Sequence, residues 1–204
     1  MNANISKLLS ATISGFLLSS CGGAHVEIPA QFPTPVVNTA PLHIGIYIKP
    51  ELNQFIYNET IKGYGKWTIR LGPAQKEMFT VLSNGMFENA ELVSSAEFDR
   101  NNVHDAILIP DIIDIQFSIP KQTRSDFFEV WIKYRMILMG PDNNLIAEWD
   151  LPAYGTANQK NYSNLQGNNP ALQQAALNAC RDAMAFFAIQ FQNIPEIKHW
   201  LDNR

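Results

Sequence analysis

Alternating hydrophobic and polar residues predict much of the chain as β-structure. In residues 42–48 and 127–139 every second side chain is apolar, which is the pattern of a strand with one buried face. Residues 154–167 are polar and contain Gly and Asn, so this segment is expected to be a loop. Further strands are expected at 66–71, 92–93, 104–119 and 145–150.

Two longer segments change from alternation to helical spacing. The first is expected to run from Gly72-Pro73 to Asn84-Gly85, because Pro suits the first turn of a helix and Asn and Gly tolerate the left-handed conformation at its end. The second begins at Asn169-Pro170, is rich in Ala and is broken by Ile194-Pro195. Strand hairpins with two helices predict the α+β class, as a mainly antiparallel sheet with both main helices packed on one face.

The first twenty-one residues have the pattern of an export signal. Lys7 precedes an apolar run that is too short to span a bilayer, which takes about 20 apolar residues, but has the length of a secretory h-region. The run ends in Leu18-Ser19-Ser20-Cys21, which resembles the lipobox of bacterial lipoproteins. The resemblance implies cleavage of a signal peptide at residues 1–20, thioether lipidation of Cys21 and acylation, palmitate included, of the new amino terminus. The alternatives are an ordinary signal peptide or a chance cysteine in a buried helix.

The lipobox resemblance also implies a location. Two or more acyl chains hold a protein stably on a membrane without a transmembrane helix. Gly22 stands where an Asp often signals retention in the inner membrane, so the resemblance favours the periplasmic face of the outer membrane. With Cys21 modified, Cys180 is the one thiol left, and no intramolecular disulfide can form.

Residues 21–41 are expected to form a tether behind the lipidated cysteine. Four prolines fall between positions 29 and 41, without apolar periodicity. Proline favours extended polyproline II geometry at ~3.1 Å per residue, so such a tether could reach roughly 60 Å. The alternative is an ordered loop packed on the domain. Residues 42–204 are then expected to be a single α+β domain.

Composition narrows the classes of partner. The 204 residues are 46% hydrophobic and 17% charged, with a formal charge of −4. That hydrophobic content suffices for a core and excludes a disordered polyelectrolyte. An acidic chain with no basic cluster along the sequence is not expected to bind nucleic acid.

Catalytic and metal-binding patterns are not found in the sequence. Its four histidines stand outside the usual ligand spacings, and no cofactor or metal is predicted. Asp111 and Asp114 lie three apart on a predicted strand and are expected on opposite faces, whereas a carboxylate dyad needs both in one site. His104-Asp105 is interpreted as a solvated pair. Cys180 is interpreted as a buried inert thiol, the alternative being a reactive thiol with a partner that lowers its pKa.

The outer face of the long strand 127–139 is the candidate partner surface. Phe127, Trp131 and Ile137 share it with Glu129, Lys133 and Arg135, and Trp149 is expected nearby on the paired strand. Aromatic residues with Arg are enriched at interface hot spots. The alternative is that another element covers this face, or that the charged residues solvate it.

The order of elements resembles that of small envelope lipoproteins, such as the lipopolysaccharide-assembly lipoprotein and transport-auxiliary lipoproteins. This likeness transfers no functional residue. Three hypotheses follow: a non-catalytic, lipid-anchored binding or assembly component of an envelope complex; a carrier or receptor for an apolar ligand such as a lipid, held between sheet and helices; or an envelope hydrolase that uses Asp111, Asp114 or His104.

Overall fold

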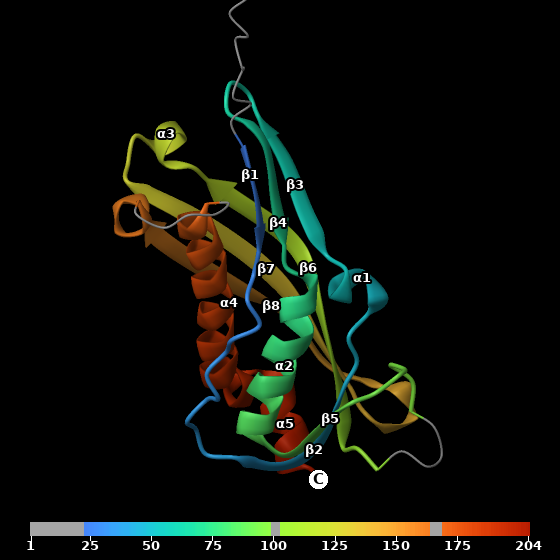
Figure 1. Ribbon diagram of the computed structural model, residues 1–204. Helices are drawn as coiled ribbons and strands as arrows, with labels where there is room; N and C mark the ends of the chain where they lie inside the picture. The colour runs from blue at the N-terminus through green and yellow to red at the C-terminus, as the bar shows by residue number, and fades with distance from the viewer. Residues whose placement is uncertain (1–22, 99–102, 164–168) are drawn as a thin grey trace, which may run out of the picture.

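A five-stranded β-sheet, called the large sheet below, is the main element of the structure. The computed structural model describes residues 23–98, 103–163 and 169–204, and Figure 1 shows their arrangement. The predicted signal peptide, the lipobox and Cys21 lie outside the described residues. The strand order is β5-β2-β6-β7-β8. The strands are β5 (Phe87–Leu92), β2 (Ala40–Ile46), β6 (Ala106–Ser118), β7 (Phe127–Met139) and β8 (Leu145–Asn158).

A smaller sheet, in the order β1-β4-β3, packs against the large one. Its strands are β1 (Gly23–Glu27), β4 (Gly65–Arg70) and β3 (Ile56–Ile61). Trp67 of β4 joins the two sheets, because its ring centroid lies 5.8 Å from that of Phe117 in β6 and 6.0 Å from that of Phe128 in β7.

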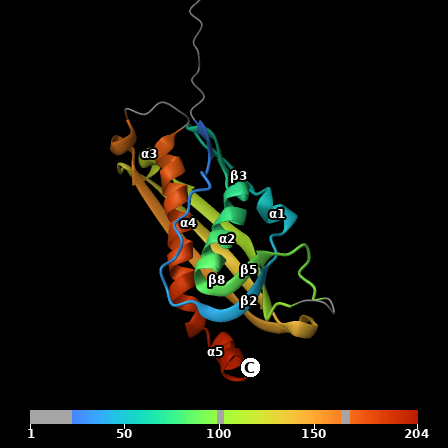
Figure 2. The same cartoon turned by 60° about the horizontal axis from the view of Figure 1, so that its bottom comes forward.

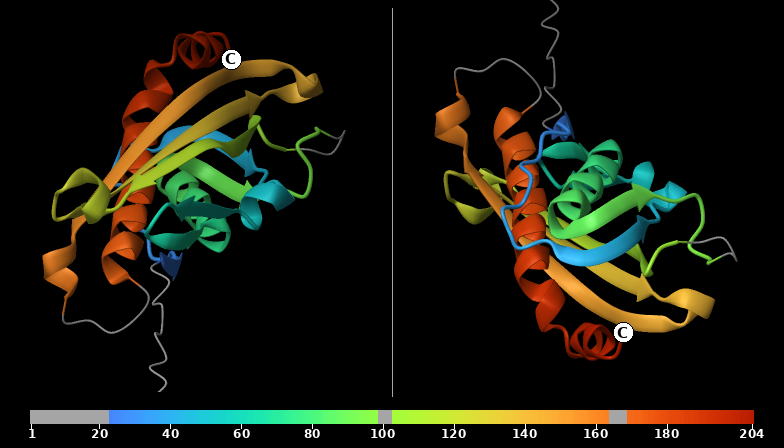
Figure 3. Two further views of the ribbon diagram at one scale, coloured as in Figure 1. Left: turned by 90° about the horizontal axis from the view of Figure 1, so that it is seen from above. Right: turned by 90° about the horizontal axis from the view of Figure 1, so that it is seen from below.

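Two long helices cover the same face of the large sheet as the small sheet does, as Figures 1 and 3 show. They are α2 (Gly72–Met86) and α4 (Pro170–Gln190), and both bury an apolar stripe. The α+β class is thus confirmed. Short helices complete the fold, and Figure 2 shows α5 beyond the end of α4. They are α1 (Pro50–Asn53), α3 (Pro120–Thr123), α5 (Pro195–Asp202) and the 3-10 turns Pro141–Asn143, Gln159–Tyr162 and Phe191–Asn193.

The large sheet is mixed rather than mainly antiparallel. β2 pairs in parallel with both β5 and β6, while β6-β7 and β7-β8 are antiparallel. The chain leaves β2, forms β3, β4 and α2, and returns as β5. A crossover that contains a helix brings strands back in parallel, and such a path cannot be read from the alternation within each strand.

The segment predicted as a tether is instead part of the folded body. β1 pairs in parallel with β4, and Val26 and Ile28 are each 3% exposed. Helix α4 also holds the end of β1, because Gln173 Nε2 donates to the carbonyl oxygen of Glu27 at 2.5 Å. The alternation of Val26 and Ile28 is too short to stand out beside the prolines that follow. The described body therefore begins at Gly23 and not at Leu42.

β8 is longer than its sequence pattern predicted. It continues through residues 154–158, which were expected to be a loop, and its inward positions there are Gly155 and Ala157. These small residues carry almost no hydrophobic signal, but they let α4 approach the strand. A Cβ at Gly155 would lie 2.8 Å from the carbonyl carbon of Asn178 and closer still to backbone atoms of Ala175 and Ala179. The Ala-rich helix thus packs directly on the backbone of β8.

Candidate interaction surface

The face of the large sheet opposite α2 and α4 carries exposed aromatic rings. Phe127 and Trp131 on β7 are 41% and 40% exposed, and Tyr154 on β8 is 40% exposed. The rings of Trp131 and Tyr154 lie side by side, with 5.2 Å between their centroids. We call Phe127, Trp131 and Tyr154 the aromatic patch. Tyr154 was missed at the sequence level because its segment was predicted as a loop.

Hydrogen bonds fix Tyr154 in place. Its hydroxyl donates to Glu129 Oε1 at 2.7 Å, and Ser118 Oγ donates to Glu129 Oε2 at 2.8 Å. Its backbone N–H, on the outer edge of β8, donates to Asp182 Oδ2 of α4 at 2.9 Å. Partial burial and the Glu129 carboxylate raise the pKa of Tyr154 above its usual value, so the hydroxyl stays a neutral donor. Tyr154 is therefore held in one position by Glu129 and Asp182.

A shallow apolar hollow borders the patch where α4 passes the edge of β8. It measures about 280 Å³. Trp131, Pro152 and Tyr154 line it from the sheet, and Asp182 and Phe186 line it from the helix. Phe186 is itself exposed, so the apolar surface continues from the sheet onto the helix.

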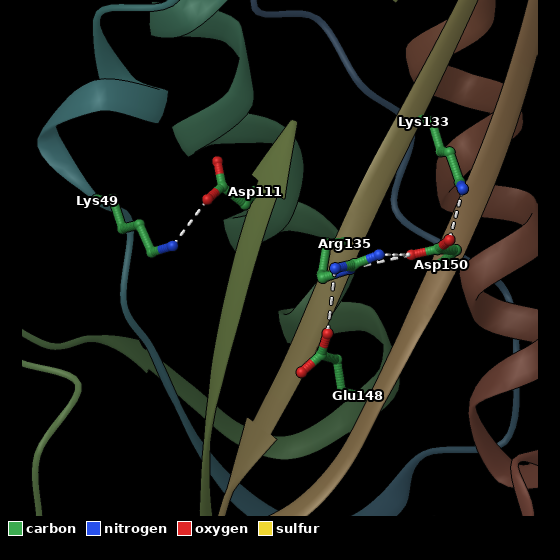
Figure 4. A network of polar contacts seen from close by, with 6 residues as sticks. All are labelled: Lys49, Asp111, Lys133, Arg135, Glu148 and Asp150. Atoms are coloured by element: carbon green, nitrogen blue, oxygen red, sulfur yellow. Dashed lines mark hydrogen bonds and ion pairs between the residues drawn. The ribbon is translucent and has the colours of Figure 1, made fainter. Parts of the chain in front are cut away.

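Charged residues occupy the next part of the same face, as Figure 4 shows. Lys133 Nζ lies 2.6 Å from one oxygen of Asp150, and Arg135 Nη2 lies 2.9 Å from the other. Arg135 also contacts Glu148 at 3.3 Å. The hydrogen bond from Lys133, and to a smaller extent that from Arg135, lowers the pKa of Asp150 below its ordinary value. These four charged residues are paired with one another on the surface of the sheet.

Asp111 and Asp114 lie on the same face, contrary to the prediction that they lie on opposite faces. A bulge shifts the β6-β7 register between Ile112 and Asp114, so Asp111 stands opposite Arg135 and Asp114 opposite Lys133. The two carboxylates nevertheless have separate partners. Asp111 Oδ2 accepts from Lys49 Nζ at 2.7 Å, and Asp114 Oδ2 accepts from the Gln116 side chain at 2.9 Å. A bulge adds one residue to a strand, and the sequence alternation does not reveal it.

Of the remaining predicted surface residues, Ile137 lies on the predicted face and Trp149 does not. Ile137 is on the outer face but half-buried, opposite the buried Ile109. Trp149 is on the other face, because its register partner is the inward-facing Met136. Its ring lies 5.9 Å from that of Phe187, a residue of α4. The prediction of Trp149 as a partner-surface residue is therefore wrong, because the side on which it lies depends on the hairpin register.

Cys180 is buried at the junction of two helices and the sheet. Burial raises the pKa of its thiol to about 11. Gln75 Nε2 of α2 donates to Cys180 Sγ at 3.6 Å, and the Tyr134 hydroxyl of β7 donates to Gln75 Oε1 at 2.9 Å. The thiol is thus buried, as interpreted, and no contact lowers its pKa below its usual range; that it is inert stays a prediction.

The histidines are distributed among separate contacts. The predicted His104-Asp105 pair is drawn apart: His104 Nε2 lies 2.7 Å from Glu91 Oε1, while Asp105 accepts from the backbone N–H of His43 and pairs with Arg204. Within the described residues, no three His, Cys, Asp or Glu side chains come together as a metal site.

Among the helices of the described residues, none has the length and hydrophobicity to cross a membrane.

Comparison with known proteins gives a likeness in fold and no match in sequence. No protein-family model and no curated protein matches the sequence. A Helicobacter pylori protein, described as a homolog of a neuraminyllactose-binding hemagglutinin, is 13% identical over 87% of this chain and 97% of its own, with a TM-score of 0.50. The two chains are similar in fold, and the identity is too low to transfer a function.

Two further solved structures have lower scores. A DUF330-family protein of Xanthomonas campestris is 10% identical over 84% of this chain and 97% of its own, with a TM-score of 0.48. A Caulobacter crescentus protein described as a lipoprotein is 10% identical over 65% of this chain and 83% of its own, with a TM-score of 0.42. Nothing is inferred from likeness at this level.

Proposed function

We propose that this chain is a lipid-anchored, non-catalytic binding component of a bacterial envelope complex, with the aromatic patch as its docking surface for a protein partner. The adjacent, exposed rings of Trp131 and Tyr154 are the observation that carries the proposal. Rings that are already ordered lose little conformational freedom when a partner covers them, which is why Trp and Tyr dominate interface energetics. The ion pairs around Asp150 would set the orientation of the partner at the rim.

The anchor part of the proposal depends on the lipobox. Leu18-Ser19-Ser20-Cys21 supports acylation of Cys21, and Gly22 favours the periplasmic face of the outer membrane. Changing Cys21→Ser should move the chain from the membrane fraction to the soluble fraction. A Cys21→Ser chain that stays in the membrane through carbonate washing contradicts the anchor.

The docking surface is tested by cross-linking in intact cells. A photo-reactive phenylalanine analogue, which keeps an aromatic ring at the position, replaces Trp131 in one variant and Trp200, on α5 at the far end of the body, in a matched control. The proposal predicts a discrete adduct for position 131 that is absent for position 200. In protein that carries no photo-reactive amino acid, the substitution Trp131→Ala should abolish co-purification of the same partner after gentle solubilisation, and Trp200→Ala should retain it. A monomer for every variant, with no adduct at position 131, would overturn the proposal.

An apolar groove supports a carrier for a lipid as the second candidate. The groove measures about 310 Å³ and lies between residues 33–37 and the second half of α4, where Met184, Ala188 and Ile189 face it. This is a different place from the predicted one between sheet and helices, where α4 packs directly on Gly155 of β8. Native mass spectrometry decides between the candidates: a retained lipid that is lost with Ala188→Trp favours the carrier.

A further inference from the structure

One end of the folded body lies next to the proposed anchor. Gly23 is the first residue of β1, and Cys21 precedes it by two residues. A fully extended chain spans at most about 3.6 Å per residue, so Gly23 lies no more than roughly 7 Å from Cys21. If Cys21 is acylated, as the proposed function requires, then the start of β1 is held at the membrane surface.

The elements around Gly23 carry a basic cluster. Gly23 is paired with Lys66 of β4, and Lys62 is in the turn that joins β3 to β4. Lys121 of α3 reaches the same place, because its Nζ lies 5.8 Å from the ring centroid of Tyr64 in that turn. Arg124 ends α3. Figure 1 shows the β3-β4 turn and α3 at the end of the body where β1 begins. We call Lys62, Lys66, Lys121 and Arg124 the basic end.

The cations of the basic end are exposed, and no carboxylate in the described part of the chain pairs with them. All four side chains are exposed, and none forms an ion pair with another described residue. Asp126, close to Arg124 in the sequence, is already paired with Lys160 at 2.6 Å. The chain as a whole has 15 Lys and Arg against 19 Asp and Glu. The basic end therefore stands out against an acidic body.

We propose that the basic end lies on the anionic phospholipid headgroups of the leaflet that holds the anchor. Lys66 is the register partner of Gly23, and neighbouring strands lie about 4.8 Å apart. Lys66 is therefore at most roughly 12 Å from Cys21, which is comparable with the Debye length of about 8 Å at physiological salt. Basic residues beside an acyl anchor strengthen its hold on an anionic membrane. Tyr64 presents the apolar body and polar tip that suit a membrane interface. The acidic remainder of the body is repelled by the same leaflet.

Vesicle binding of residues 22–204 tests the proposal. This part contains every described helix and strand and lacks Cys21, so no acyl chain masks the contribution of the surface. The probe is a vesicle of phosphatidylethanolamine with one quarter phosphatidylglycerol, compared with a neutral phosphatidylcholine vesicle. The double variant Lys62→Gln/Lys121→Gln is compared with Lys76→Gln/Lys198→Gln, which removes the same charge from exposed positions on α2 and α5.

The expected result is binding to the anionic vesicle that weakens with salt and is absent for the neutral one. Each basic residue near a charged leaflet contributes about fivefold, so the double variant at the basic end should bind about 25-fold more weakly. The control should stay close to the unmodified chain. No preference for the anionic vesicle, or equal losses in both double variants, would overturn the proposal.

Failure of this inference and failure of the proposed function give different results. A chain acylated at Cys21 whose body ignores anionic vesicles refutes the basic end alone. A body that binds such vesicles through the basic end, from a chain that is never acylated in cells, refutes the anchor.

Discussion

Replacing Gly155 with Ala should destabilise the protein through a clash with α4. The added Cβ would lie 2.8 Å from the carbonyl carbon of Asn178, and nearer to the backbone of Ala175 and Ala179. An ordinary contact begins at 3.4 Å, so the helix has to move away by more than half an ångström, a shift of the kind that overpacking a core produces. Backbone atoms cannot rotate aside as a flexible side chain would.

The size of the effect follows from what this shift disturbs. Overpacking costs about 1–3 kcal/mol. The shift also strains two hydrogen bonds that join α4 to the edge of β8, from Asn178 Nδ2 to the Thr156 carbonyl and from the Tyr154 amide to Asp182. Hydrogen bonds contribute about 1 kcal/mol each. We therefore expect a loss of about 3 kcal/mol, which is a fall in Tm of roughly 6–12 °C for a chain of this length.

Urea unfolding followed by circular dichroism measures this loss, with Gly63→Ala as the comparison. A Cβ at Gly63 meets no atom within 4 Å, so Gly63→Ala causes no clash. Its positive φ of 82° is unfavourable for alanine and should cost about 1 kcal/mol of stability. Gly155→Ala should thus be the more harmful variant although its backbone is ordinary. A Gly155→Ala protein within about 0.5 kcal/mol of the unmodified chain, the range of a neutral surface change, would show that α4 does not rest on β8 there.

Three further predictions concern buried and paired polar groups. Tyr134→Phe leaves the buried Gln75 carbonyl without its donor and should cost about 1–3 kcal/mol; an unchanged urea midpoint contradicts this. The pKa of Cys180 is raised from 9.0 to about 11. At pH 8 its thiol should therefore react with a thiol reagent at least about a hundredfold more slowly than in the urea-unfolded chain. Equal rates in the folded and unfolded chain would show that the thiol is accessible in the fold. Lys133→Gln should raise the pKa of Asp150 toward its ordinary 3.8, as followed by NMR. Because the ion pairs lower the pKa of Asp150, they stabilise the fold fully at a pH above the pKa of Asp150 in the unfolded chain. This stabilisation is lost as the pH falls through the pKa of Asp150 in the folded chain. An Asp150 pKa that Lys133→Gln leaves unchanged contradicts the pairing.

The elements with strong periodicity were predictable from sequence. β7 and α2 begin or end within a residue or two of the predicted bounds. Every buried position of β7 is a large apolar residue, and the buried stripe of α2 includes Met78, Phe79 and Leu82, with Pro73 marking its first turn. β1 and the second half of β8 were missed because their inward positions are few or small. In β8, Gly155 and Ala157 carry the packing and give no hydrophobic signal.

The candidate surface was predictable only in part, because register decides which side chains share a face. Phe127 and Trp131 belong to one strand, so their common face follows from alternation alone. Tyr154 and Trp149 are on β8, and their sides depend on how β8 pairs with β7. The basic end is harder still to see in the sequence. Its cations come from the β3-β4 turn, β4 and α3, and the fold brings together residues that are about sixty positions apart.

The most direct test of the account is the intact mass of the chain extracted from membranes. If acyl chains at Cys21 hold this body in the envelope, the mass is that of residues 21–204 with the added lipid, and the aromatic patch and basic end act beside a membrane. A chain found in the soluble fraction at the mass of all 204 residues, with a free Cys21 thiol, would contradict the account.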